Sequence, residues 1–153
     1  MSDVKPPRLT GDDRATLRAL LQYQRESFVK KVSGVDETSA RTAVVASGTT
    51  LLWLTQHMAQ AEHTWIVRRF AGDDTPPPPE AETIPDAVDV YRQMWERADA
   101  IVTTSDLDAL CADVGDASQV NLRWVLAHLL EETARHAGHA DILRELVDGE
   151  TGR

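Results

Sequence analysis

The sequence predicts an all-α protein, and more narrowly a four-helix bundle with long crossover connections. Apolar residues recur at steps of three and four in four long segments, which is the period of one face of a helix. Glycines and prolines concentrate between these segments, and the sustained alternation of Val, Ile, Thr and Tyr that is typical of strands is absent. A chain of 153 residues can bury one continuous core, so we expect residues 1–153 to form a single domain.

The first helix is predicted to begin at Thr10, because Asp13 three residues later approximates a capping box, and to end near Gly34. We expect four of its apolar side chains to be buried, namely Leu17, Leu20, Leu21 and Phe28. A short helical segment is then predicted over residues 37–44.

The second long helix is predicted to follow a turn at residues 47–50, which also supplies its N-cap, and to run to about Phe70. Its inward stripe, at helical spacing, consists of Leu54, His57, Met58, Ala61 and Trp65. This stripe places one histidine, His57, on the apolar face of the helix.

Residues 72–79 include four consecutive prolines and are predicted to form an extended surface connector. The third helix is predicted to begin at the capping signal of Thr83 and Asp86 and to end at about Thr103. Its inward stripe consists of Ile84, Val88, Tyr91, Trp95, Ala98 and Val102. A loop over residues 105–119, with a helical turn near residues 107–111, precedes a fourth helix from about Val120 to Gly149.

The fourth helix carries four metal-capable side chains on one face, at steps of four, four and three residues: His128, Glu132, His136 and His139. The predicted inward seam of this helix consists of Val125, Leu129, Glu132, His136, His139, Leu143 and Leu146. Three of these seven positions can ionise. Burying such groups costs several kcal/mol unless they are paired, and a bound cation is one efficient way to pair them.

His57, Glu132 and His136 are the predicted metal ligands. Glu132 and His136 lie one helical turn apart and can hold the same ion, and His57 is the histidine that the second helix turns inward. Two nitrogens and one oxygen suit a divalent metal, zinc best, with nickel, iron or manganese as alternatives. Three protein ligands leave one position open for water or substrate. Two simpler interpretations stay open: a hydrogen-bonded core histidine, or a surface Glu/His pair if the seam is rotated by one position.

The other three histidines are not assigned as first-choice ligands. His139 could replace Glu132 as a ligand, or orient the site through a hydrogen bond, and His128 is a weaker ligand candidate. His63 lies about 120° around the helix from His57 and should point elsewhere.

Two glutamates, Glu62 and Glu131, fall off the inward stripes, and we expect them to be solvated. The four tryptophans, Trp53, Trp65, Trp95 and Trp124, are assigned to packing because they occur at helical spacing.

Composition excludes several classes of partner. The formal net charge is -9 and the basic residues are scattered, which argues against nucleic acid. The single cysteine, Cys111, excludes an intrachain disulfide and fits a reducing compartment. No membrane span and no apolar signal region are evident, so a cytoplasmic protein without a membrane partner is expected.

The stretch LRWVLAHLLEETARHAGHADILRELVDG at residues 122–149 resembles the last helix of DinB-like proteins, in particular the actinobacterial mini-circle-type branch. The stretch SGTTLL at residues 47–52, which leads to HMAQAE at residues 57–62, resembles the same branch. This resemblance implies a four-helix bundle of DinB-like type, commonly a homodimer, with a divalent metal held by His57, Glu132 and His136. Many relatives have histidine where this chain has Glu132, but mycothiol-dependent maleylpyruvate isomerase is similar to it in having glutamate there.

The leading hypothesis is an enzyme whose metal activates a low-molecular-weight thiol, mycothiol if the resemblance holds, for transfer to a small electrophile or isomerisation of one. The first alternative is a hydrolase in which the metal activates water. The second is a non-enzymatic dimeric protein whose metal is structural or sensory, which predicts a fourth protein ligand such as His139.

Overall fold

The computed structural model describes residues 4–112 and 119–152, and it confirms the all-α prediction. The regular elements within these ranges are helices: α1 (Asp13–Val32), α2 (Glu37–Arg41), α3 (Leu51–Glu62), the π-helical segment η1 (His63–Phe70), α4 (Ile84–Thr103) and α5 (Leu122–Asp148). One isolated backbone bridge, between Leu110 and Asn121, closes the base of the loop before α5.

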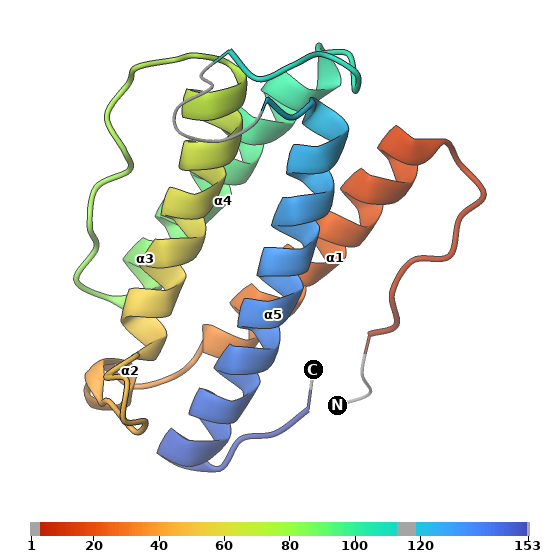
Figure 1. Ribbon diagram of the computed structural model, residues 1–153. Helices are drawn as coiled ribbons and strands as arrows, with labels where there is room; N and C mark the ends of the chain where they lie inside the picture. Colours follow the sequence, from red (N-terminus) through yellow and green to blue (C-terminus); the bar gives the residue numbers. More distant parts are fainter. Residues whose placement is uncertain (1–3, 113–118, 153) are drawn as a thin grey trace.

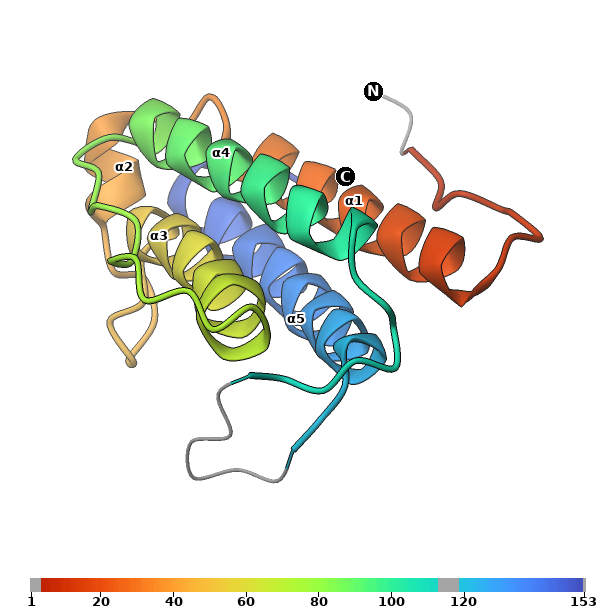
Figure 2. The same cartoon turned by 90° about the horizontal axis from the view of Figure 1, so that it is seen from above.

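The four long helices form one bundle (Figure 1). The helices α1 and α5 run in one direction, and α3 with η1 and α4 run in the other. The connection at residues 71–83 travels back along the bundle, so that α3 and α4 are parallel neighbours. Crossovers were predicted at both long connections, but only the connection at residues 71–83 runs the length of the bundle, because α4 ends and α5 begins at the same end. Figures 1 and 2 both show α3 beside α5, which is the pair that matters for the site.

Most predicted helix boundaries agree with the structure. Thr50, Thr83 and Asn121 each accept a hydrogen bond from a backbone N–H of the first turn of α3, α4 and α5. Gly149 ends α5 in the left-handed conformation, with φ 80°, as glycine permits. The predicted stripe of α4 is buried in full: Ile84, Val88, Tyr91, Trp95, Ala98 and Val102.

The first two helices are shorter than predicted. The helix α1 begins at Asp13 rather than Thr10, because Asp12 Oδ1 accepts the Ala15 N–H at 2.9 Å and therefore occupies the N-cap. Of its expected core residues, Leu21 and Phe28 are buried but Leu17 and Leu20 are only half-buried. The helix α2 ends at Arg41 rather than at residue 44.

The last turns of the second long helix were predicted as ordinary helix, but residues 63–70 wind as a π-helix. Such segments are rare and occur frequently at functional sites. The helical turn expected near residues 107–111 is a simple turn, and the loop prediction at residues 113–118 lies outside the described residues.

The predicted seam of α5 is correct at Val125, Leu129 and Leu143, which are buried, but in the middle of the helix it lies one position away from the residues that the structure buries. Leu129, Thr133, Ala137, Ala140 and Leu143 are buried, whereas Leu146 of the predicted seam is 55% exposed. The prediction followed Glu132, His136 and His139, each of which immediately precedes a buried residue. The polar stripe therefore borders the core instead of lying within it.

The prediction that Glu62 is solvated was wrong. Its side chain is fully buried and receives two hydrogen bonds of 2.7 Å from the Arg25 guanidinium, which is itself 2% exposed. Arg25 also bonds Asp99 at 3.0 Å, so this ionic cluster joins α1, α3 and α4. Paired charges of this kind are how a bundle core accommodates a carboxylate.

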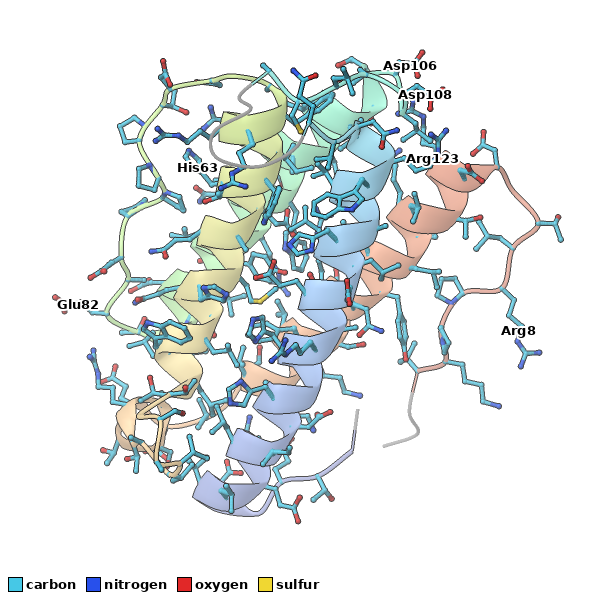
Figure 3. The ribbon with its side chains drawn as sticks, viewed as in Figure 1. Arg8, His63, Glu82, Asp106, Asp108 and Arg123 are labelled. Carbon is cyan, nitrogen blue, oxygen red and sulfur yellow. The ribbon has the colours of Figure 1, made fainter. Side chains whose placement is uncertain are left out.

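A second ionic contact fixes the start of α5. Arg123 pairs with Asp13 at 3.2 Å and with Asp108, which brings together α1, α5 and the turn that follows α4 (Figure 3). Within the described ranges, no helix has both the length and the apolar character that a bilayer crossing requires.

Candidate metal centre

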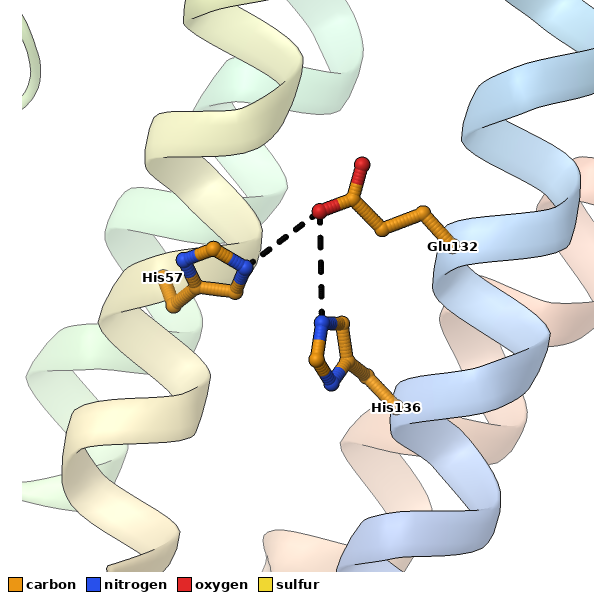
Figure 4. A group of neighbouring side chains, drawn as sticks. All are labelled: His57, Glu132 and His136. Carbon is orange, nitrogen blue, oxygen red and sulfur yellow. Dashed lines mark ion pairs between the residues drawn. The ribbon is translucent and has the colours of Figure 1, made fainter. Parts of the chain in front are cut away.

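The predicted trio comes together between α3 and α5 (Figure 4). His57 Nε2 lies 3.3 Å from Glu132 Oε1, and His136 Nε2 lies 3.9 Å from the same oxygen. One potential ligand atom from each of His57, Glu132 and His136 lies within 4.8 Å of the other two. Two nitrogens and one oxygen therefore converge on a space of the size that one cation occupies.

The helices place these side chains by simple geometry. Glu132 and His136 are separated by one turn of α5, so their side chains emerge on the same face. His57 faces them from the second turn of α3, whose start is fixed by the Thr50 cap. The three side chains are 31%, 20% and 19% exposed in the order His57, Glu132, His136, so the trio is partly buried and can be reached from solvent.

At Glu132 and His136, the surroundings favour the protonation states that metal ligands need. The hydrogen bond from His57, helped by the charges of His128 and His136, lowers the pKa of Glu132 against the opposing effect of burial. Burial, and then repulsion from His57, lowers the pKa of His136 below its ordinary value. Glu132 thus tends to be ionised and His136 to be neutral.

The second oxygen of Glu132 has a different partner. His128 Nε2 lies 3.4 Å from Glu132 Oε2, so this imidazole can hold the carboxylate with its other oxygen turned to the trio. His139 lies outside the trio, with its ring 6.1 Å from that of His136.

Several buried polar atoms lie behind the site. His136 Nδ1 is buried and makes no hydrogen bond with the described residues, and the same holds for Thr133 Oγ1, Tyr91 Oη and Trp95 Nε1. Thr133 and Trp95 are both close enough to the Tyr91 hydroxyl to influence its pKa, which burial raises well above its usual range. Of these atoms, only His136 Nδ1 belongs to the trio.

Sequence reasoning missed the aromatic rings around the trio. Trp53 is 52% exposed and stacks on His57 at a centroid distance of 5.1 Å, and Trp124 is 44% exposed and stacks on His128 at 4.9 Å. Trp65 contacts both Trp124 and His128. The assignment of all four tryptophans to packing holds for Trp95, which is buried, and for Trp65, which is partly buried against the core, but not for the exposed Trp53 and Trp124. A signal was present in the spacing, since Trp53/His57 and Trp124/His128 are both i,i+4 pairs.

A pocket of about 540 Å³ opens beside the trio. Its lining combines aromatic and charged side chains: Trp65, His128, Glu131, Glu132, Arg135 and His136. Glu131 is exposed, as predicted, and here it borders the pocket. The volume is in the range that small-molecule sites occupy.

His63 points away from the trio, as its position on the helix predicted. It is buried against the connection that follows η1, and its Nε2 lies 3.0 Å from the Thr75 carbonyl oxygen (Figure 3). Its role is to hold this connection against η1.

Comparison with known proteins covers most of the chain. A family model described as mycothiol-S-transferase matches residues 16–149. Among solved structures, the chain is similar to the crystal structure of a conserved protein from Enterococcus faecalis, with 17% sequence identity and a TM-score of 0.67. The match covers 89% of this chain and 97% of that chain, and at this identity it shows the fold alone. A search of the curated proteins finds no significant match.

Proposed function

Because this chain belongs to the mycothiol-S-transferase family of DinB-like proteins, we propose that it is a metal-dependent enzyme that transfers mycothiol, or a similar thiol, to a small electrophile or uses it to isomerise one. The observation that carries the proposal is the convergence of His57, Glu132 and His136 beside an open pocket. The description of the matched family suggests mycothiol as the thiol, and the trio could hold the metal.

The donor atoms of the trio fit a divalent cation, zinc best among the candidates. Imidazole nitrogen and carboxylate oxygen are ordinary zinc ligands, and nickel, iron and manganese accept the same set. Metal binding requires neutral histidine and ionised glutamate, which are the states that the lowered pKa values of His136 and Glu132 favour. A cation held here would lower the pKa of a thiol ligand and favour thiolate at neutral pH.

The remaining residues would bind and orient the reactants. His128 would keep the Glu132 carboxylate in position through its second oxygen, and Trp53 would fix the plane of the His57 ring by stacking. The pocket lined by Trp65 and Arg135 would hold the organic part of a reactant. Since His139 lies outside the trio, three protein ligands would leave room for a thiol, which supports an enzyme over a closed structural site.

Thiol transfer by the zinc-loaded protein tests this function. With mycothiol and a broad panel of small electrophiles, we expect a rate above the reaction of the free thiol, and loss of that rate in His57→Ala. Gln60→Ala, on the same helix but outside the trio, should keep the rate. No rate above the free reaction across the panel would refute the proposal. Turnover without thiol would instead indicate the hydrolase, and bound metal without turnover a structural or sensory protein.

The proposal includes a single domain over residues 1–153 that assembles as a homodimer in the cytoplasm. The dimer follows from the DinB-like resemblance, and the single cysteine fits a reducing compartment. Sedimentation equilibrium should give twice the chain mass of 16.9 kDa, and a monomer at micromolar concentration would contradict the dimer.

A further inference from the structure

Three aromatic rings beside the trio form a continuous surface that metal binding does not require. The Trp65 ring lies 5.4 Å from Trp124 and 4.6 Å from His128, and Trp124 stacks on His128 at 4.9 Å with an interplanar angle of 13°. Trp65 comes from η1 and the other two from α5. Arg69 lies over the Trp65 ring at 4.5 Å and holds it from η1.

This aromatic surface is directly connected to the trio. His128 Nε2 reaches Glu132 Oε2 at 3.4 Å, and the pocket that contains Trp65 and His128 also contains Glu132 and His136. A molecule in this pocket with its reactive end at the trio would therefore lie against Trp65 and His128, and one that extends past them would reach the exposed Trp124 ring, which contacts both.

The lining of the pocket indicates the chemistry of such a molecule. Flat rings pack well against the C–H faces of a sugar, and the charged side chains of Glu131 and Arg135 can hydrogen-bond its hydroxyl groups. A purely apolar ligand would desolvate these charges without pairing them. A phosphate or carboxylate is disfavoured because the two carboxylates of Glu131 and Glu132 outnumber the one guanidinium, that of Arg135, in this lining. Aromatic walls with charged hydrogen-bonding groups at the rim suit a neutral, hydroxyl-rich ring.

We infer that Trp65, Trp124 and His128 form a subsite for the sugar portion of the thiol. This inference rests on the proposed function for the identity of the thiol, because mycothiol carries its cysteine on a glucosamine linked to inositol. The sugar would pack on the exposed Trp124 ring while the sulfur is directed to the trio. The subsite would thereby select a sugar-bearing thiol over cysteine itself.

Binding of a sulfur-free fragment tests the subsite separately from the chemistry. N-acetylglucosaminyl-inositol has the sugars of mycothiol but no thiol, so its binding does not require a metal ligand. By calorimetry, we expect it to bind the wild-type protein with and without zinc, and Trp124→Ala to weaken this binding about tenfold. Trp53→Ala removes another exposed tryptophan beside the trio, which lines a different pocket, and should change the affinity by less than about twofold.

Circular dichroism would detect whether Trp124→Ala alters the fold. In that case His128→Ala provides a second variant, and it should also weaken binding of the fragment. Absence of fragment binding to the wild-type protein, or equal binding by wild type, Trp124→Ala and His128→Ala, would overturn the subsite. If the wild-type protein binds the fragment as expected but transfers no thiol, the subsite is supported and only the proposed function is refuted.

Discussion

At the centre of the trio, the two oxygens of Glu132 face different partners. Oε1 lies near His57 and His136, and Oε2 lies near His128. A carboxylate that binds an ion through one oxygen is oriented best when its other oxygen is also held. His128 and His136 lie one turn on either side of Glu132, so their contacts with the carboxylate arise within α5 alone. His57 adds the remaining contact from α3.

Metal affinity should decrease at acidic pH, because His136 must be neutral to bind a metal. Burial lowers the pKa of His136 below 6.5, so this imidazole stays neutral at a pH where a free histidine is half protonated. Because zinc needs the neutral ring, protonation of His136 should weaken zinc binding only in the acidic part of the range from about pH 8 to 5, as the pH drops through the lowered pKa. Zinc titrations across this range check the prediction, and affinity that increases as the solution becomes more acidic would contradict it.

The sequence identified the residues of the trio but not their surroundings. Spacing on α5 and the inward position of His57 were sufficient to group His57, Glu132 and His136. Contacts between residues that are distant in the sequence could not be predicted from helical spacing. The pairing of Glu62 with Arg25, 37 residues earlier, depends on how α1 packs against α3, and periodicity within one helix carries no such information.

At the scale of the helix, the position of His57 depends on the start of α3. Thr50 accepts the Trp53 N–H at 3.1 Å and is therefore the N-cap at which α3 begins. Thr50→Ala should lower the free energy of unfolding by about 1 kcal/mol, as loss of an N-cap does. Denaturant unfolding measures the change. Thr49→Ala, in which the lost hydroxyl contacts only the exposed Ser47 side chain, should cost less, and equal losses would refute the cap assignment.

The one-position rotation of the α5 seam has a physical cause. The buried residues Thr133, Ala137 and Ala140 are small or carry a hydroxyl, so they give a weak hydrophobic signal in the sequence. Small side chains there let α5 pack closely, and the polar stripe at Glu132 and His136 then borders the contact with α3. The simpler alternative of a rotated seam therefore describes the burial of α5 from Thr133 to Ala140, and the trio still forms because His57 faces the same border.

In the whole molecule, the buried Arg25–Glu62 pair joins α1 to α3, and the bond from Arg25 to Asp99 extends the link to α4. Arg25→Ala would leave the Glu62 carboxylate buried without its guanidinium, and the unfolding free energy should fall by about 3–5 kcal/mol. Arg97→Ala is the matched control, because its pair with Asp73 is more than one-third exposed and should contribute less than about 1 kcal/mol. Urea unfolding of both variants tests this, and similar losses would contradict the account.

The overall topology was predictable because the inward stripes were clear and the proline-rich connector could not be helical. Glycine and proline marked the ends of the long helices, and the stripe of α4 is buried throughout. The π-helical winding of η1 was not predictable, since residues 63–70 show no break in helical composition.

The most direct test of the account is the zinc content of the purified protein after zinc loading and gel filtration, measured for wild type, His57→Ala, Glu132→Ala and His136→Ala. We predict one zinc per chain in the wild type and a loss of binding of about tenfold or more in each variant, with circular dichroism unchanged. Equal zinc content in the wild type and in His57→Ala would show that α3 and α5 do not hold a cation between them.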